Sequence, residues 1–438
     1  MNLSRQVALI ALIAASLTPM ACSSEKRSPP PEASQGSPGE PEPRATVEEL
    51  ALPDQTALPR EPDHTPLCPR GEEEACARDC EGGDLKRCVA LGLARRSYFD
   101  AEAAQESVAL LRRACDEAMI EGCYHLGETW RTGHGVKKDP KRAHELHTRA
   151  CEGGWPAACF SLALMLKDQT PPRPQEALVA ASKACRAGVV RACAYTARAL
   201  GEGRSVARDL KSAARFHEVA CEAGSLRDCL SLALLLDDGT PEEPARVAAL
   251  YEKACEGSDD LLLACARLGK MLGLGLGVPE DLKRGQELLL KACNAVPTSC
   301  GLGVKVFQKG CDRGDADICN DLGLMYLTGR GVDPEPVRAR GLFERSCEGG
   351  APEGCTSLGL CMVRGEGGDA DPRAAVTLFE GACQRDHARA CSNLGIMLYR
   401  GQGVSQDRKR AAGLWKERCA EGHEPSCELQ RAEEAGEL

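Results

Sequence analysis

The sequence predicts an all-α protein, built as an array of helical hairpins that disulfide bonds hold together. Cysteines recur in pairs with a regular period, and each interval between pairs reads as helix, glycine turn, helix. Aromatic residues make up only 3% of the chain, and Ala, Leu and Gly dominate instead. Such a composition suits many small repeated interfaces better than one large core.

The first 22 residues read as an export signal rather than as part of the fold. Arg5 supplies a positive charge, and the apolar run at residues 7–17 is too short to span a bilayer. Cys22 follows the small residue Ala21, which resembles a bacterial lipoprotein signal in which the cysteine becomes lipidated. Pro19 stands where that pattern prefers leucine. The alternative is ordinary cleavage near Cys22, which would give a soluble secreted protein.

Residues 23–66 are expected to form a tether, because prolines recur along them with few large apolar residues between. That composition cannot bury enough surface to offset the entropy lost on ordering. With Cys22 lipidated, the tether would connect the repeats to the outer membrane, on the periplasmic side or at the cell surface. The net charge of −10 is spread in mixed signs without a basic stripe, which argues against nucleic-acid partners.

The cysteines define the repeats in the rest of the chain. The regular pairs are Cys80 with Cys88, Cys115 with Cys123, Cys151 with Cys159, Cys185 with Cys193, Cys221 with Cys229, Cys255 with Cys265, Cys293 with Cys300, Cys311 with Cys319, Cys347 with Cys355, Cys383 with Cys391, and Cys419 with Cys427. Most partners are eight residues apart, and the first members advance by 34 to 38 residues, except for one step of 18 after Cys293. Cys68 and Cys76 have the same offset and are a candidate twelfth pair.

One interval, from Cys383 to Cys419, shows the pattern of a single unit. Residues 388–399 carry apolar side chains at helical spacing, and residues 401–404 (Gly-Gln-Gly-Val) end that helix. Asp407 can cap the second helix, and Gly422 can end it in a left-handed turn. The first cysteine of a pair therefore falls in the last turn of one helix, and the second in the first turn of the next.

Disulfides explain the pairs better than metal ligation does. Zinc sites favour gaps of about two to four residues and bring four ligands together from two pairs. Here the gap is seven residues, the pairs are a repeat apart, and the signal segment indicates export. Closing such a short loop stabilises a fold by roughly 2–3 kcal/mol in the chain-entropy model.

Two questions about the cysteines stay open from the residues alone. The four cysteines between Cys68 and Cys88 allow three pairings. Cys361 is left over and occupies the helix position held by Met325 and Met397 in sister repeats, which favours a buried apolar thiol. A reactive or intermolecular thiol is the alternative.

Two segments carry a family resemblance: residues 319–326 (CNDLGLMY) and residues 391–398 (CSNLGIML). With the Gly-x-Gly-Val turn and the aspartate before the second helix, they resemble Sel-one-like repeats, or SLRs, over residues 68–427. More narrowly, the chain is similar to cysteine-rich secreted bacterial SLR proteins with one disulfide per repeat. The resemblance implies a right-handed α/α superhelix related to tetratricopeptide arrays. Family members mostly serve as interaction scaffolds, and some cysteine-rich ones are labelled β-lactamases or penicillin-binding proteins.

The pattern is interrupted in places. Proline-bearing loops at residues 168–174 and 237–244 replace the Gly-x-Gly-Val turn, and about half a repeat is missing between Cys293 and Cys311. We expect the superhelix to divide there into an N-terminal array at residues 67–300 and a C-terminal array at residues 301–438.

Catalytic motifs are hard to find in the repeats. A serine β-lactamase would need Ser-x-x-Lys on a helix and a Lys-Thr-Gly motif, and the repeats have neither. His144 and His147 do not form His-Glu-x-x-His, so they are interpreted as a surface pair. No catalytic residue, metal site or cofactor is expected, although β-lactamase-like or cell-wall activity remains the alternative function.

A binding surface is better supported than a catalytic site. In a superhelix of this class, the first helices of the repeats line the concave face. Polar side chains recur on that face two residues after the second cysteine of a pair. Five of them are predicted contacts for a protein or peptide ligand: His125, Tyr195, Arg267, Asp321 and Asn393. Thr328, Ser357 and Arg364 belong to the same polar stripe. The chain is therefore predicted to be an exported scaffold.

Overall fold

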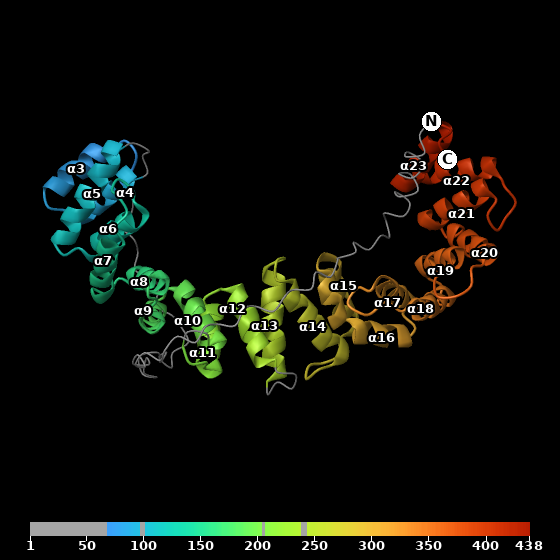
Figure 1. Cartoon of the computed structure of the whole chain (residues 1–438), viewed down its shortest axis with the longest axis horizontal. Coiled ribbons are helices and arrows are strands. Elements are labelled where there is room, and N and C mark those ends of the chain that lie inside the picture. Colours follow the sequence, from blue (N-terminus) through green and yellow to red (C-terminus); the bar gives the residue numbers. More distant parts are fainter. Residues whose placement is uncertain (1–67, 97–100, 204–205, 238–242) are drawn as a thin grey trace. The chain divides into compact units, whose positions relative to one another are not determined.

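The computed structural model describes residues 68–96, 101–203, 206–237 and 243–438, and every regular element in these ranges is a helix. The signal segment with Cys22 and the tether at residues 23–66 lie outside the described residues. The described helices follow one another as hairpins (Figure 1). The prediction of an all-α, disulfide-stapled hairpin repeat is confirmed.

Each hairpin consists of an A helix and a B helix, and α3 (Glu73–Glu81) precedes the first of them. The A helices are α4 (Leu85–Arg96), α6 (Ile120–Thr132), α8 (Pro156–Asp168), α10 (Val190–Glu202), α12 (Leu226–Leu236), α14 (Leu262–Leu274), α17 (Ala316–Thr328), α19 (Pro352–Arg364), α21 (Ala388–Arg400) and α23 (Glu424–Glu434). The B helices are α5 (Ala101–Asp116), α7 (Pro140–Glu152), α9 (Pro174–Arg186), α11 (Leu210–Glu222), α13 (Pro244–Gly257), α15 (Leu282–Ala295), α16 (Val304–Asp312), α18 (Pro336–Glu348), α20 (Pro372–Cys383) and α22 (Arg408–Ala420).

The helix ends follow from local chemistry. Asp139 and Asp407 begin α7 and α22, and their carboxylates accept backbone N–H groups of the first turn. The A helices α6 and α21 end at Gly133 and Gly401, whose φ angles are 80° and 65°. A left-handed residue at this point lets the chain leave the helix, and glycine adopts that conformation at least cost.

Disulfides join each B helix to the helix that follows it, which after α15 is the short helix η1 (Pro297–Leu302). Within the described residues there are twelve disulfides, and each predicted pair is bonded: Cys68 with Cys76, Cys80 with Cys88, Cys115 with Cys123, Cys151 with Cys159, Cys185 with Cys193, Cys221 with Cys229, Cys255 with Cys265, Cys293 with Cys300, Cys311 with Cys319, Cys347 with Cys355, Cys383 with Cys391, and Cys419 with Cys427. The Cα–Cα distances run from 4.4 Å to 6.4 Å, within the range of ordinary disulfides.

Both open questions about the cysteines are answered by these bonds. Among the four cysteines near the start of the repeats, Cys68 pairs with Cys76 and Cys80 pairs with Cys88, so partners are neighbours along the chain. Cys361 is the free cysteine of the described residues, and it is buried, as its place among the methionines of sister repeats suggests.

The core of each hairpin depends on close approach of its two helices. In several hairpins, the side chain four residues before the first cysteine of a pair lies against a glycine of the A helix. Phe379 packs beneath Gly359 in this way, and Trp415 packs beneath Gly395. We call the space beneath each of these glycines a slot. Phe379 and Trp415 are 1% and 0% exposed, so their side chains fill these slots completely.

The described residues form two compact units, which divide between residues 242 and 243. The shortened repeat lies inside the second unit, where the short helix η1 (Pro297–Leu302) replaces an A helix and α16 follows it directly. One apolar cluster runs from Leu289 across this point to Cys361. The sequence-based boundary between residues 300 and 301 therefore falls inside a continuous core, and the division into two arrays stays a prediction.

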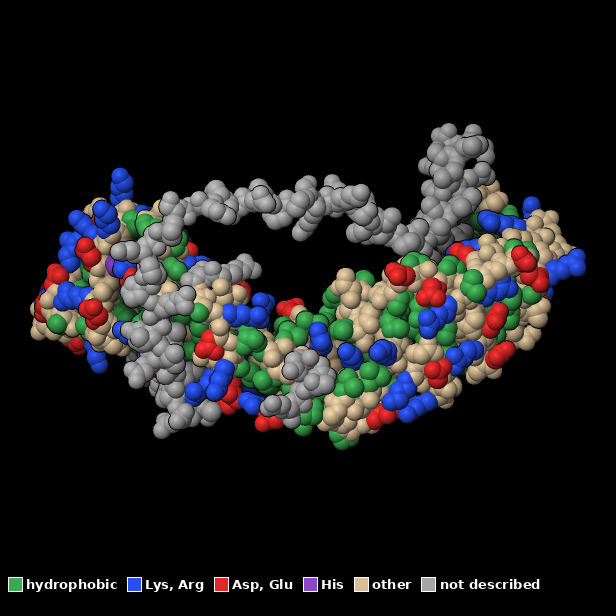
Figure 2. Space-filling view, turned by 60° about the horizontal axis from the view of Figure 1, so that its bottom comes forward, with side chains coloured by type: hydrophobic (Ala, Val, Ile, Leu, Met, Phe, Trp, Pro, Cys, Tyr) green, Lys and Arg blue, Asp and Glu red, His purple; other side chains and the backbone are tan. Residues whose placement is uncertain are grey.

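The surface carries both signs of charge. Acidic and basic side chains are interspersed over the described residues on the face shown in Figure 2. No helix within the described ranges is both long and apolar enough to cross a membrane. Twelve disulfides are typical of a protein exported to an oxidising compartment.

Candidate functional site

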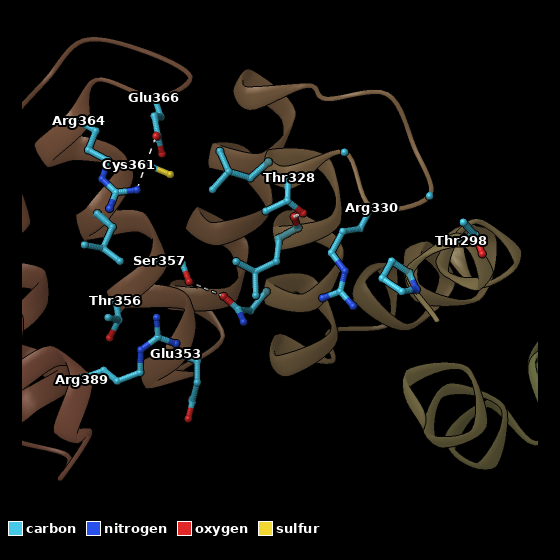
Figure 3. A pocket seen from close by; sticks show the side chains of 17 residues that line it. Thr298, Thr328, Arg330, Glu353, Thr356, Ser357, Cys361, Arg364, Glu366 and Arg389 are labelled. Carbon is cyan, nitrogen blue, oxygen red and sulfur yellow. Dashed lines mark hydrogen bonds and ion pairs between the residues drawn. The ribbon is translucent and has the colours of Figure 1, made fainter. Parts of the chain in front are cut away.

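A groove crosses the A helices of the second unit. It has a volume of about 860 Å³ and spans η1, α17, α19 and the first turn of α21 (Figure 3). Consecutive A helices contact each other here, α17 with α19 and α19 with α21. The residues lining the groove are Pro297, Thr298, Asn320, Leu324, Leu327, Thr328, Gly329, Arg330, Gly331, Glu353, Thr356, Ser357, Leu360, Cys361, Arg364, Glu366 and Arg389.

The floor of the groove is apolar and its walls are polar. Leu324, Leu327 and Leu360 are half-buried and line it from α17 and α19. The hydroxyl of Ser357 donates to the Asn320 side-chain oxygen at 2.8 Å, which ties the two helices together. An apolar floor with a few polar groups is the usual composition of a ligand site.

Charged side chains stand around this floor. Arg330 donates to the backbone oxygen of Cys293 at 2.8 Å, and Arg364 lies 3.7 Å from the Glu366 carboxylate. Glu353 lies 3.6 Å from the ring of His387, the residue immediately before α21. The groove can therefore accept both apolar and charged groups of a ligand.

Six segments of the chain match the family model described as Sel1 repeat: residues 120–155, 190–225, 262–295, 316–350, 352–387 and 388–423. Each matched segment contains one A helix and the B helix after it. The chain is a Sel1 repeat protein. The groove lies across three of these matched Sel1 repeats. The hairpins α4–α5, α8–α9 and α12–α13 lie outside the matched segments and have the same arrangement of helices and cysteines.

Several solved structures are similar to this Sel1 repeat protein. One is a protective antigen present in uropathogenic Escherichia coli strains that displays an SLR fold; the identity is 20%, the match covers 83% of this chain and 90% of that chain, and the TM-score is 0.46. Another is a Sel1 repeat protein from Oxalobacter formigenes, with 20% identity, coverage of 87% and 98%, and a TM-score of 0.29. Yeast Tom70 has 12% identity, coverage of 80% and 96%, and a TM-score of 0.26. A search of curated proteins found no matching relative.

The five predicted contacts lie on A helices of the Sel1 repeats, but none of them lines the groove. His125 is only 9% exposed and packs at a tilt against Tyr124, with 4.8 Å between the ring centroids. Tyr195 packs edge-on against Phe160, and burial raises its pKa. Arg267, Asp321 and Asn393 are half-buried. A binding role for these five residues stays a prediction.

The groove itself uses neighbouring positions. Asn320 and Thr356 come one residue after the second cysteine of a pair, and Leu324 and Leu360 come five residues after it. Each residue along a helix turns the side chain by about 100°. On α17 the lining residue Asn320 therefore lies one helix position before the predicted contact Asp321, whereas other positions of the predicted polar stripe coincide with the lining. Thr328, Ser357 and Arg364, from the same predicted polar stripe, do line the groove.

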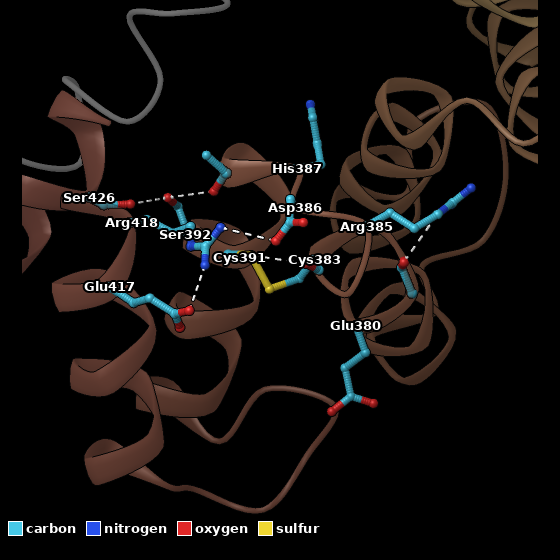
Figure 4. The surroundings of a disulfide bond; sticks show 12 residues. Glu380, Cys383, Arg385, Asp386, His387, Cys391, Ser392, Glu417, Arg418 and Ser426 are labelled. Atoms are coloured by element: carbon cyan, nitrogen blue, oxygen red, sulfur yellow. Dashed lines mark hydrogen bonds and ion pairs between the residues drawn. A yellow bond between two sulfur atoms is a disulfide. The ribbon is translucent and has the colours of Figure 1, made fainter. Parts of the chain in front are cut away.

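Two hydroxyl–imidazole pairs lie at repeat junctions, and no sequence pattern indicated them. Thr356 Oγ1 is 2.8 Å from His387 Nδ1, and Ser392 Oγ is 3.3 Å from His423 Nδ1 and 2.6 Å from Ser426 Oγ. Figure 4 shows Ser392 and Ser426, which meet at the second of these junctions, beside the Cys383–Cys391 disulfide.

The proton positions at these pairs do not suit nucleophilic catalysis. Thr356 Oγ1 donates to the Pro352 carbonyl and is 2% exposed, so the His387 ring has to donate to it. An activated nucleophile needs the opposite arrangement, with the ring accepting the hydroxyl proton. We interpret these pairs as contacts between helix starts. Within the described residues, no group of His, Cys, Asp or Glu is arranged to hold a metal ion.

The prediction that His144 and His147 form a surface pair is wrong for His147, which is completely buried in α7. Its ring occupies the slot beneath Gly127 that an aromatic residue fills in other repeats. The imidazole Nε2 lies 3.2 Å from Glu128, which also accepts from Arg131 and from Ser161 at 3.0 Å. Burial alone would raise the pKa of Glu128, but hydrogen bonds from His147 and Arg131 outweigh it and hold the pKa well below its usual range.

Proposed function

We propose that this protein is an exported scaffold whose groove across α17, α19 and α21 binds an extended peptide segment of a partner protein. The composition of the groove is the observation that supports this best. Leu324, Leu327 and Leu360 offer an apolar surface to side chains, whereas Asn320 and Ser357 offer hydrogen bonds to a main chain. An extended peptide presents both kinds of group along its length.

The unused hydrogen-bonding capacity of Asn320 adds to this support. Its side-chain oxygen accepts from Ser357, and within the described residues its amide nitrogen has no hydrogen-bond partner. Asn320 is 7% exposed, so a donor of this kind gains most from a ligand carbonyl that enters the groove.

The groove can be tested with displayed peptides. Twelve-residue random peptides would be selected on the full-length protein, and the affinity of the winners would be measured by fluorescence anisotropy. Leu360→Asn places a polar group in the floor, and we expect it to weaken binding by about tenfold or more. Val337→Asn, on α18, changes a residue that is 75% exposed and lies outside the groove, and it should leave the affinity unchanged. Equal binding by both variants would refute the groove as the binding site.

We further propose that Cys22 is lipidated and anchors the scaffold at the outer membrane, with residues 23–66 as a spacer. The support is the apolar run, the small residue before the cysteine and the proline-rich composition that follows. Cys22→Ala should abolish labelling by radioactive palmitate in cells and move the protein from the membrane fraction to the soluble fraction. An unchanged distribution would favour ordinary cleavage and secretion.

A further inference from the structure

The charges around the groove are not balanced. Three guanidinium groups line it, from Arg330, Arg364 and Arg389, against the carboxylates of Glu353 and Glu366. Glu366 pairs with Arg364 at 3.7 Å, and the Glu353 carboxylate lies 3.6 Å from the His387 ring, so three guanidinium groups stand against two carboxylates. The remaining charge of the groove is therefore positive.

Arg389 is the clearest unused group. It lies in the first turn of α21 and is exposed, and within the described part of the chain it takes part in no hydrogen bond or ion pair. Glu353 lines the groove near Arg389 in Figure 3, but its carboxylate lies 3.6 Å from the His387 ring and forms no ion pair with Arg389 in the described residues.

Arg330 stands on the other side of the floor. It follows α17 in the turn between Gly329 and Gly331, and one of its nitrogens donates to the backbone oxygen of Cys293. A carbonyl partner fixes the side chain but leaves its charge unneutralised. Figure 3 shows Arg330 and Arg389 on opposite sides of Ser357, with the groove between them.

We propose that the groove selects peptide segments in which an apolar side chain is flanked by acidic side chains on both sides. The apolar side chain lies on Leu324, Leu327 and Leu360, and the two carboxylates pair with Arg330 and Arg389. Guanidinium–carboxylate pairs are stronger than neutral hydrogen bonds and add selectivity for charge. This inference rests on the proposed peptide-binding function and specifies its ligand class.

Asp321 makes the selection weaker than it would otherwise be. It lies on α17 and interacts electrostatically with both Arg330 and Glu353. The negative charge of Asp321 therefore partly offsets the positive charge of Arg330, which weakens the attraction of Arg330 for a ligand carboxylate. Removing that charge should improve the binding of an acidic ligand, which is a gain that damage to the fold would not produce.

The test uses the full-length protein and three pools of fluorescein-labelled nonapeptides with a central leucine and blocked ends. One pool carries Asp or Glu on both sides of the leucine, the second carries Asn or Gln, and the third carries Lys. We expect the acidic pool to bind about tenfold more tightly than the amide pool and the lysine pool to bind weakest. The gap should shrink at high salt, because screening weakens exposed charge pairs.

The arginine variants separate charge recognition from general damage. Arg330→Gln and Arg389→Gln should each weaken the affinity for the acidic pool by about tenfold. The affinity for the amide pool should stay within about twofold of the wild-type value. Arg373→Gln is the matched control, because Arg373 is an exposed arginine on α20 outside the groove. Asp321→Asn should strengthen binding of the acidic pool by about two- to threefold. Circular dichroism melting curves would check that each variant is folded.

Two results would overturn the inference. One is equal affinity of the protein for the acidic and amide pools. The other is an equal loss of affinity for both pools in the arginine variants. A third outcome is that no nonapeptide binds, while Leu360→Asn still weakens the binding of the displayed peptides. In that case the preference for acidic segments is wrong, and the proposal that the groove binds peptides stands. If Leu360→Asn weakens the binding of neither kind of peptide, the proposed function itself is wrong.

Discussion

At the residue scale, one position in each B helix governs how closely a hairpin can pack. Four residues before the first cysteine of a pair, an inward side chain meets a small residue of the A helix, which in several hairpins is glycine. A Cβ atom added at Gly359 would lie 2.6 Å from Phe379, which is closer than real Cβ contacts come. Phe379 is 1% exposed and has no room to retreat.

Gly359→Ala should therefore lower the free energy of unfolding by roughly 1–3 kcal/mol, because the new methyl group overpacks the core. Urea denaturation followed by circular dichroism measures the change. At Gly381, in α20, an added Cβ would have no atom within 4 Å. Gly381→Ala should therefore raise the free energy of unfolding by about 0.5–1 kcal/mol. Shifts in the same direction for both variants would contradict this account of the slot.

The repeat formed by α6 and α7 fills the same slot with His147, and its A helix carries Glu128 where α19 carries Leu360. The two polar residues compensate each other. Glu128→Leu alone should cost roughly 3–5 kcal/mol, because it leaves a buried imidazole without its carboxylate. Adding His147→Phe should recover most of that loss, since the pair then matches the combination found in α19 and α20. A double-mutant cycle in urea measures the coupling, and additive effects would show that the two side chains are independent.

Glu128 also gives the first unit a defined acid sensitivity. Because its folded pKa is depressed, its contribution to stability is present above the unfolded pKa of about 4.3 and is lost as pH falls toward the folded pKa. The difference in unfolding free energy between wild type and Glu128→Gln should be constant from pH 7 to about pH 5 and should shrink below about pH 4. Urea midpoints measured across this range test it, and a difference that does not depend on pH would exclude the proposed linkage.

At the element scale, the turn from each B helix to the next A helix repeats one backbone shape. A left-handed glycine occupies it at Gly154, Gly188 and Gly224. The turn after α5 has Ala118 instead, with a φ of 66°. A side chain in this conformation costs roughly 1 kcal/mol relative to glycine.

Ala118→Gly should accordingly raise the free energy of unfolding by roughly 0.5–1 kcal/mol. Ala187 is the control, because it lies in the equivalent turn one residue before Gly188 and has a φ of −94°. Ala187→Gly relieves no strain and adds freedom to the unfolded chain, so it should be neutral or slightly destabilising. Thermal melts of the two variants and wild type make the comparison, and equal shifts would argue against strain at Ala118.

The turn chemistry explains why the hairpins could be predicted from sequence and the groove could not. Aspartate caps, glycine stops and cysteine pairs act within about ten residues, so each one is visible in the sequence as a local pattern. The lining of the groove depends on which face of α17 turns toward α19, and an offset of one residue changes that face. Arg389 reaches the groove from a third repeat, which no local pattern indicates.

The burial of His147 was missed for the same reason. Its slot is defined by Gly127 on the preceding helix, and its charge partner Glu128 lies on that helix as well. A histidine among charged residues in the sequence is usually at the surface, and only the aligned slots of the other repeats reveal that this one is in the core.

At the scale of the whole molecule, the cysteines should divide into one thiol and a set of disulfides. Cys361 is 1% exposed, and burial raises the pKa of its thiol to about 11. Alkylation of the native protein should therefore leave this residue unmodified, and unfolding without reductant should add one label to the repeats. Reduction should then add 24, two for each disulfide. Intact mass measures each step, and extra labels before reduction would show that some pairs are open.

The short spacing of the disulfides has a consequence for how the chain matures during export. Every bond links cysteines that are neighbours along the described chain, with sequence separations of 7, 8 or 10. As the chain emerges from a translocation channel, an oxidant that joins each new cysteine to the one before it makes the native bonds in order of emergence, without later reshuffling. Cys361 would break that order by capturing Cys383. Native pairing therefore requires that Cys361 be passed over, and its burial in the folded α19 helix would withdraw its thiol from Cys383.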